Sequence, residues 1–284
     1  MVTLPTFVIA GTQKAATTWL YECLVEHPQV SMSRTKELHF FCDADQCPKS
    51  TWTRGVDWYR TNFPGTRPDA SVVGEASVDY MYYECAPERI HGLNPEMKVI
   101  FILRDPIDRA YSAYWMRRRA RPSYPPFSEF VNSDSDVVRR GFYFEQIQRY
   151  RQYFPDDQLK VLIYEDIDGS AKSFLRDVFE FLEVDAAFSP DSALQLIGET
   201  KAMRPTLSTF FYRYGAKVLR LRPALTAWRL FKKLTGCKRK TASSGPKYPP
   251  MGPSDRERLD FLFRDETDRL YQFLGRRIST WSID

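Results

Sequence analysis

The sequence has 284 residues, of which 43% are hydrophobic and 15% aromatic, so the chain can bury a substantial core and is not globally disordered. Its 41 Lys and Arg against 36 Asp and Glu give a formal net charge of +5, a mild excess that suits an anionic ligand without requiring nucleic acid. The longest apolar runs, such as residues 99–103, are too short to span a bilayer and no signal peptide is visible, so we expect a cytoplasmic protein.

The first half of the sequence predicts two units of strand, turn and helix. Residues 6–10 are a short apolar run that ends in a glycine, which is typical of a buried parallel strand. Residues 17–26 then have helical spacing and end before a His-Pro pair. Residues 99–103 are the clearest central strand. The Asp-Pro pair that follows them opens another helix, because proline is favoured at the first helical position.

The second half continues the alternation. Residues 141–154 and 171–182 have the spacing of helices, and residues 159–164 between them read as a third strand. A final amphipathic helix is expected from Ser254, a good N-cap, to about residue 274. Strands that alternate with helices indicate an α/β fold built around a parallel sheet.

Residues 201–247 have a different composition. They contain 13 Lys or Arg and no Asp or Glu, with aromatic residues among the cations. We predict one domain over residues 1–284 with a basic helical insertion at about 201–247. This segment is either a solvated cover over the site or a surface that recruits an anionic or amphiphilic acceptor or contacts a membrane. We expect no nucleic-acid binding, because no recognised module accompanies the charge.

The five cysteines are spread along the chain. Cys42 and Cys47 are separated by four residues, but no second pair of ligands at metal-binding spacing follows them, and the three histidines do not cluster in the sequence. We therefore predict reduced, mostly buried thiols and no metal site.

The segment Gly-Thr-Gln-Lys-Ala-Ala-Thr-Thr at residues 11–18 connects the first strand to its helix. Such a connection binds anions, because the free backbone N–H groups and the helix dipole both face the loop. Lys14 adds a charge, and Thr17 and Thr18 add donors. A Walker loop requires lysine directly before the hydroxyl residue, whereas Lys14 comes three residues before Thr17 and the second glycine is absent. Taken alone, the segment is also compatible with an ordinary turn.

A second anion contact is predicted at the end of the strand 99–103. Arg104 follows that strand, and Ser112 lies two turns into the next helix. Ligands of open α/β sheets bind at the carboxyl edge of the strands, so the two contacts suit a ligand with phosphates at both ends. The alternative for Arg104 is a salt bridge to Asp105 or Asp108.

These segments resemble the 5′-phosphosulfate loop and the 3′-phosphate motif of sulfotransferases that use PAPS (3′-phosphoadenosine 5′-phosphosulfate). The similarity is greatest to the branch of heparan sulfate N- and 3-O-sulfotransferases and their bacterial relatives, and it covers nearly the whole chain. It includes Lys-Glu-Leu-His-Phe-Phe at residues 36–41, Trp-Tyr at 58–59, Gly-Glu-Ala-Ser at 74–77, Gly-Phe-Tyr at 141–143, Phe-Pro at 154–155 and the ending at 274–281.

The resemblance implies a P-loop-like three-layer fold, with a central parallel sheet flanked by helices, and a role for each matching residue. Lys14 would hold the phosphosulfate and offset charge on the bridging oxygen as the S–O bond breaks. Glu37 would be the general base, and His39 would orient the acceptor or the base. The remaining residues assigned to the nucleotide are Gln13, Ala15, Ala16, Thr17, Thr18, Trp19, Arg104, Ser112, Tyr143, Lys247 and Tyr248. Each of the two catalytic assignments has a purely structural alternative. Glu37 could be a carboxylate at the surface or at the start of a helix, and His39 could be a partly buried imidazole with its hydrogen bonds satisfied.

Three departures from the family pattern stand out. Ala15 and Ala16 occupy places where family loops commonly carry glycines. The heparan-type E-K-T-P element has a lysine where this chain has Ala76 and a proline where it has Val78, so recognition of a heparan-like acceptor is in doubt. A late nucleotide loop of the family aligns only weakly with residues 244–249.

We predict an enzyme that moves a sulfonyl group from PAPS to an acceptor hydroxyl or amine by direct in-line transfer, without a metal, and releases PAP. Glycans, lipid-linked sugars and natural products all stay open as acceptors, and so does the oligomeric state. One alternative is a P-loop nucleotide kinase or other phosphotransferase, which would need Mg²⁺. The other is a protein that binds nucleotides or polyanions without catalysis.

Overall fold

A computed structural model describes residues 4–63, 69–131, 135–194 and 248–281. The chain divides into two units, Met1–Ile197 with Pro250–Asp284, and Gly198–Pro249. The predicted basic insertion at 201–247 lies outside the described residues, so the single-domain organisation stays a prediction.

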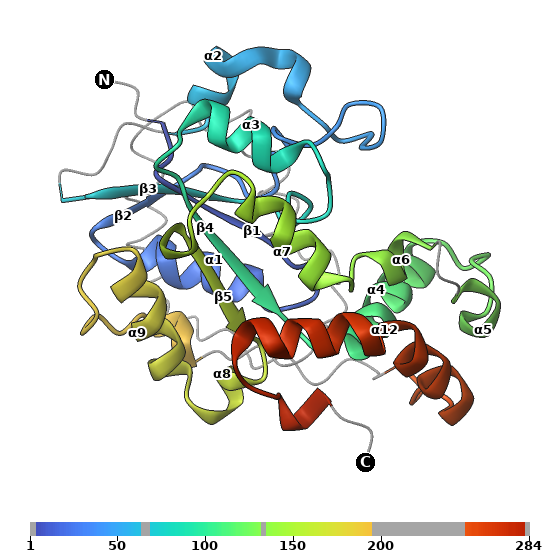
Figure 1. The fold of residues 1–284 in the computed structure, drawn as a ribbon. Coiled ribbons are helices and arrows are strands. Elements are labelled where there is room, and N and C mark those ends of the chain that lie inside the picture. Colours follow the sequence, from blue (N-terminus) through green and yellow to red (C-terminus); the bar gives the residue numbers. More distant parts are fainter. Residues whose placement is uncertain (1–3, 64–68, 132–134, 195–247, 282–284) are drawn as a thin grey trace, which may run out of the picture. The chain divides into compact units, whose positions relative to one another are not determined.

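A five-stranded sheet is at the centre of the first unit (Figure 1). All described strand pairs are parallel, and the strand order is β2-β3-β1-β4-β5. The chain moves from β1 to one side of the sheet and then crosses to β4 on the other side, so β1 and β4 flank the point where the winding reverses. The strands are β1 (Phe7–Gly11), β2 (Val30–Met32), β3 (Val72–Ala76), β4 (Lys98–Leu103) and β5 (Leu159–Ile163).

Helices connect the strands in the predicted alternation. The helix at Thr17–Glu26 is confirmed at its predicted bounds, whereas the predicted helix 141–154 is shorter, at Tyr143–Arg151. The last helix begins at Pro253, with Gly252 as its N-cap in place of the predicted Ser254. The α-helices are α1 (Thr17–Glu26), α2 (Gly55–Arg60), α3 (Ala86–Leu93), α4 (Pro106–Ala120), α5 (Phe127–Phe130), α6 (Asp136–Arg139), α7 (Tyr143–Arg151), α8 (Asp166–Gly169), α9 (Ala171–Phe181) and α12 (Pro253–Leu274); the 3-10 helices are η1 (Trp52–Arg54), η2 (Asp156–Gln158), η3 (Asp191–Leu194) and η4 (Ser279–Trp281).

Two apolar cores lie on opposite faces of the sheet. Side chains of α3, α7 and α12 pack with Val99, Phe101 and Leu103 of β4 on one face. Side chains of α1 and α9 pack with Ile100 and Ile102 of the same strand on the other face. Because β4 is covered on both faces, its sequence is a continuous apolar run, as expected of a central parallel strand. The predicted three-layer α/β fold is confirmed.

None of the helices in the described part of the chain is long and apolar enough to cross a membrane.

Close packing of β3 against β1 makes Gly74 sensitive to substitution. A Cβ there would lie 2.1 Å from the Cζ atom of Phe7, a fully buried ring. We expect Gly74→Ala to lower the free energy of unfolding by about 1–3 kcal/mol, measured by urea denaturation, because the ring must move inside a packed core. The control is Gly92→Ala in α3, where no atom lies within 4 Å of the added Cβ. Equal stability of the Gly74→Ala variant and the unchanged protein would contradict this packing.

Candidate active site

The loop between β1 and α1 is an anion-binding turn. Lys14 and Ala16 have φ angles of 75° and 57°, in the left-handed region. Ala16 is the N-cap of α1, and no side chain caps the helix there. The first N–H groups of a helix have no partner within the helix, and left-handed residues before it turn further N–H groups toward the same point. The loop therefore offers several donors and the positive end of a helix dipole to one anion.

Arg104 connects this loop to the end of β4. Its Nη1 donates to the Lys14 carbonyl at 3.2 Å, and its guanidinium lies over the Tyr164 ring, 5.0 Å from the centroid. Neither neighbouring acid pairs with it in the described residues. Asp105 instead caps α4 by accepting from the backbone N–H groups at 107 and 108, and Asp108 pairs with Arg256 at 2.7 Å. The salt-bridge alternative for Arg104 is wrong.

Positive charge is concentrated at the loop. Burial, together with the charges of Arg104 and Arg119, lowers the pKa of Lys14 to about 8. Arg119 was not among the predicted site residues, although it lies seven positions, or two turns, after Ser112 on the same face of α4. Three cations that repel one another favour binding of an anion with several negative charges.

Two buried polar atoms near the predicted anion contacts have no hydrogen-bond partner in the described chain. They are the Oγ of Ser112, in a fully buried residue, and the Oε1 of Gln13. Buried polar groups are nearly always paired, so an unpaired one indicates a missing ligand or water. The Ser112 hydroxyl therefore fits the phosphate that the sequence assigns to it.

Other predicted nucleotide residues have structural partners. The buried Tyr143 hydroxyl donates to the Arg104 carbonyl at 2.8 Å, so it holds the backbone of Arg104. The Trp19 indole N–H donates to the Ser192 carbonyl at 3.0 Å. Ala15 and Thr17 are buried, Ala16 is half-buried and Thr18 is exposed. Lys247 lies outside the described residues and Tyr248 belongs to the second unit, so both assignments stay predictions.

Glu37 lies at the carboxyl end of β3, the strand beside β1. Its backbone N–H donates to the Ala76 carbonyl at 2.8 Å, and its Oε2 accepts from the Val78 N–H at 3.1 Å. Its Oε1 pairs with Lys36. The structure thus brings Glu37 to the same edge of the sheet as the anion loop, and fixes it through β3.

His39 is held by an acid that the sequence did not reveal. Its Nδ1 lies 3.2 Å from the Oδ2 of Asp79, whose Oδ1 accepts from Arg140 at 2.6 Å. Burial alone would raise the pKa of Asp79, but the hydrogen bond from His39 and the charge of Arg140 outweigh it and lower the pKa to about 2. No local pattern connects residues 40 positions apart, so only the fold shows this pair.

A second carboxylate is buried beside Glu37. Burial and the charge of Glu37 together raise the pKa of Glu75 to about 8, although hydrogen bonds from the hydroxyls of Tyr80, Tyr59 and Ser77 oppose the rise. At pH 7 the Glu75 carboxyl is therefore mostly protonated.

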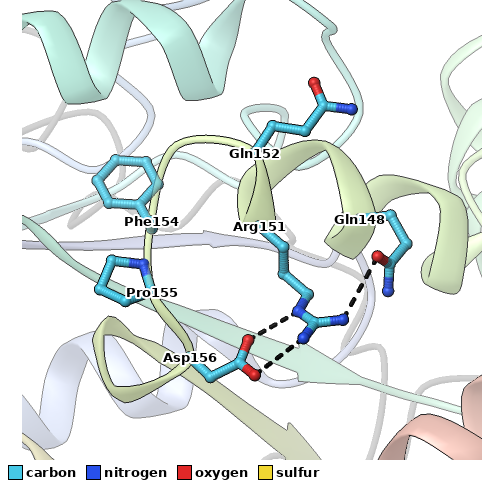
Figure 2. Close-up of a pocket in the computed structure, with 6 residues that line it drawn as sticks. All are labelled: Gln148, Arg151, Gln152, Phe154, Pro155 and Asp156. Atoms are coloured by element: carbon cyan, nitrogen blue, oxygen red, sulfur yellow. Dashed lines mark hydrogen bonds and ion pairs between the residues drawn. The ribbon is translucent and has the colours of Figure 1, made fainter.

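A shallow hollow of about 440 Å³ lies elsewhere, at the end of α7 (Figure 2). Its one guanidinium, on Arg151, already pairs with Asp156 at 2.7 Å. Neither the anion loop nor Glu37 lines it, so we do not assign the site there. The lining residues are Gln148, Arg151, Gln152, Phe154, Pro155 and Asp156.

The anion loop, Arg104 and Glu37 all lie at the carboxyl edge of the sheet in a P-loop-like α/β fold. A family profile described as "Sulfotransferase domain" matches residues 4–204. The chain belongs to this family.

Two relatives illustrate the similarity. The chain is 30% identical to the human bifunctional heparan sulfate N-deacetylase/N-sulfotransferase 3, over 98% of this chain and 31% of that protein. It is 28% identical to the mouse heparan sulfate glucosamine 3-O-sulfotransferase 5, over 97% of this chain and 74% of that protein. The chain thus spans under a third of the length of the first relative.

Solved structures agree with the fold. A sulfotransferase from Alicyclobacillus acidocaldarius superposes with a TM-score of 0.72 at 24% identity, covering 98% of this chain and 99% of the other. The mouse sulfotransferase SULT7A1 in complex with PAP superposes with a TM-score of 0.53 at 17% identity, covering 95% and 88%.

The position of Lys14 destabilises the folded chain. Its pKa is lower in the fold than the usual 10.5, so the cost of burying the charge is present in full below about pH 8 and decreases as the pH rises toward 10.5. We expect Lys14→Met to raise the free energy of unfolding by about 1–3 kcal/mol at pH 7 and by less at pH 10, measured by urea denaturation. Lys172→Met, at an exposed lysine of α9, is the control and should change little. A Lys14→Met variant less stable than the unchanged protein at pH 7 would contradict the cation cluster.

Proposed function

We propose that this chain transfers a sulfonyl group from PAPS to an acceptor hydroxyl or amine. The observation that carries the proposal is the pair of anion contacts at adjacent strand ends, connected by the hydrogen bond from Arg104 to the Lys14 carbonyl. One contact is an uncapped helix N-terminus with a lysine, and the other holds an unpaired buried hydroxyl at Ser112. PAPS carries anionic groups at its 5′ and 3′ ends, which matches two contacts of this kind.

Each side chain has a distinct task in this proposal. Backbone N–H groups of residues 13–19 and Lys14 hold the phosphosulfate end, and Arg104 and Ser112 hold the 3′-phosphate. When bound, the donor supplies the sulfonyl group, and its sulfur exchanges the bond to the bridging oxygen for a bond to the acceptor. Glu37 accepts the proton that the acceptor releases. Lys14 stabilises the negative charge left on the bridging oxygen. The transfer uses no metal and no covalent bond to the protein.

We further propose a glycan, glycolipid or natural product as the acceptor. The relatives named for heparan sulfate support a sugar, but this chain lacks the cation of their E-K-T-P element. Ala76 stands there, fully buried in the apolar core that contains Ile9 and α1. A densely sulfated polymer loses one anchoring charge at this position, so acceptors with fewer negative charges suit the chain better.

Two further predictions from the sequence belong to this proposal. The basic segment 201–247 is proposed to recruit the acceptor or to contact an anionic membrane surface, and the protein is proposed to be cytoplasmic. The first rests on the composition of the segment, and the second on the short apolar runs and the lack of a visible signal peptide.

The direct test is transfer of radiolabelled sulfate from PAPS to a panel of acceptors. We expect Glu37→Gln to reduce the rate by about 10²–10⁴-fold while PAP still raises the melting temperature, because the base contributes to transfer and not to nucleotide binding. Lys14→Ala should reduce both the rate of transfer and the rise in melting temperature caused by PAP. Stabilisation by ADP with Mg²⁺ and not by PAP would refute the proposal, and PAP binding without transfer to any acceptor would favour a binding protein. An unchanged rate in Glu37→Gln would remove its assignment as the base.

The pKa of Lys14 gives PAP affinity a distinct pH dependence. A bound anion favours the charged lysine, whereas the free protein loses that charge as the pH rises through about 8. Affinity should therefore be greatest below this pH and fall about tenfold per pH unit above it. Titration calorimetry between pH 7 and pH 9.5 measures the slope. Lys14→Met should bind more weakly with a flatter profile, and equal slopes for the two proteins would contradict the role of Lys14.

A further inference from the structure

The loop that follows Glu37 contains a group of metal-ligating side chains that the proposed transfer does not use. One ligand atom each of His39, Cys42 and Cys47 lies within 4.8 Å of the other two, and all three residues are buried. Within the described residues, no other group of three His, Cys or acidic side chains meets in this way. We predicted no metal because no second pair of ligands follows the two thiols in the sequence. His39, three residues before Cys42, is a further candidate ligand, and the fold brings Asp79 beside it.

Asp79 lies next to this group of three and is a candidate fourth ligand. Its Oδ2 lies 3.2 Å from the His39 Nδ1, which in turn lies 4.0 Å from the Cys42 Sγ. A tetrahedral Zn²⁺, with bonds of about 2.3 Å to sulfur and about 2.0–2.1 Å to nitrogen and oxygen, separates its ligand atoms by about 3.3–3.8 Å. The nitrogen–oxygen distance is close to this range, whereas the sulfurs lie up to 4.8 Å from the other ligand atoms of the group and would have to move inward on binding.

The backbone of this loop is held in place independently of any metal. The Cys42 carbonyl accepts from the Ser50 hydroxyl at 2.9 Å and from Arg89 at 2.7 Å. The Thr51 N–H donates to the His39 carbonyl at 3.2 Å. Ligands on a pre-formed loop lose little conformational entropy when they bind a cation.

Charge and ligand type select the cation. Two thiolates balance a divalent ion, and the remaining negative charge of Asp79 is balanced by Arg140, which donates to its other oxygen at 2.6 Å. That contact is the outer-shell hydrogen bond that ligating carboxylates commonly make. Two sulfurs, one imidazole nitrogen and one carboxylate oxygen suit Zn²⁺, whereas Mg²⁺ and Ca²⁺ prefer oxygen ligands alone.

We propose that His39, Cys42, Cys47 and Asp79 form a structural Zn²⁺ site beside the candidate base. Four protein ligands close the coordination sphere, so the ion binds no substrate. His39 is then a metal ligand in this chain, in place of the acceptor-orienting role that the resemblance assigns to it. The site fixes the loop two residues after Glu37. It does not depend on the proposed sulfonyl transfer.

The test uses the full chain, purified with a reductant and without a chelator. We expect one Zn²⁺ per chain by inductively coupled plasma mass spectrometry. Replacement of zinc by Co²⁺ should give the visible absorption of a tetrahedral ion with thiolate ligands. Both readouts use the unsubstituted protein, so they do not depend on whether a variant folds.

Variants locate the site. Cys42→Ser and Cys47→Ser should retain Zn²⁺ at least about tenfold more weakly, whereas Cys85→Ser, at a half-buried thiol outside the set, should retain it normally. A reduced protein that contains no zinc and gives no cobalt–thiolate absorption overturns the proposal. So does a Cys42–Cys47 disulfide, found by mass spectrometry, whose reduction does not enable Zn²⁺ uptake. Equal loss in Cys85→Ser would place the metal elsewhere.

Discussion

The hydrogen bond from the Arg104 guanidinium to the Lys14 carbonyl connects two loops that are 90 residues apart. It spans the ends of β1 and β4, which are adjacent strands on either side of the point where the winding reverses. The Tyr143 hydroxyl holds the Arg104 carbonyl, so α7 positions the same residue from behind. The sheet therefore fixes the distance between the two anion contacts, and a ligand must match that distance to bind both loops.

This edge is locally unfavourable in the folded chain. It combines like charges, two left-handed residues and a helix without a side-chain cap. Such features persist only where surrounding structure enforces them. Here β4 is buried on both faces between the two apolar cores, and Asp105, directly after Arg104, caps α4. The two apolar cores thus hold this edge in a conformation that is more stable with a bound anion than without one.

Local patterns predicted the parts of the structure that depend on local chemistry. The strands β1, β4 and β5 and the helix α1 follow from apolar runs and turn residues, and the anion loop follows from its place between strand and helix. By contrast, β2 has only three residues, and β3 carries Gly74 and the buried Glu75, so neither has a strand-like pattern. The Asp79–His39 pair, the raised pKa of Glu75 and the approach of Arg119 to Lys14 each depend on tertiary contacts, which no spacing in the sequence encodes.

Different parts of the fold hold the donor-binding residues and the segment that follows Glu37. The donor half consists of strand ends and a helix N-terminus, whose positions the sheet determines. Glu37 is tied to β3 through Ala76 and Val78, so the base also belongs to this rigid part. The segment after it, residues 38–51, is irregular and is held by side-chain contacts to Asp79 and Arg89. Phe40 and Phe41 of this segment belong to the core that covers the sheet, whereas residues 44–46 and 48–49 are exposed and can change without disturbing it. Recognition of the acceptor can therefore change between relatives while donor binding and the position of the base are retained.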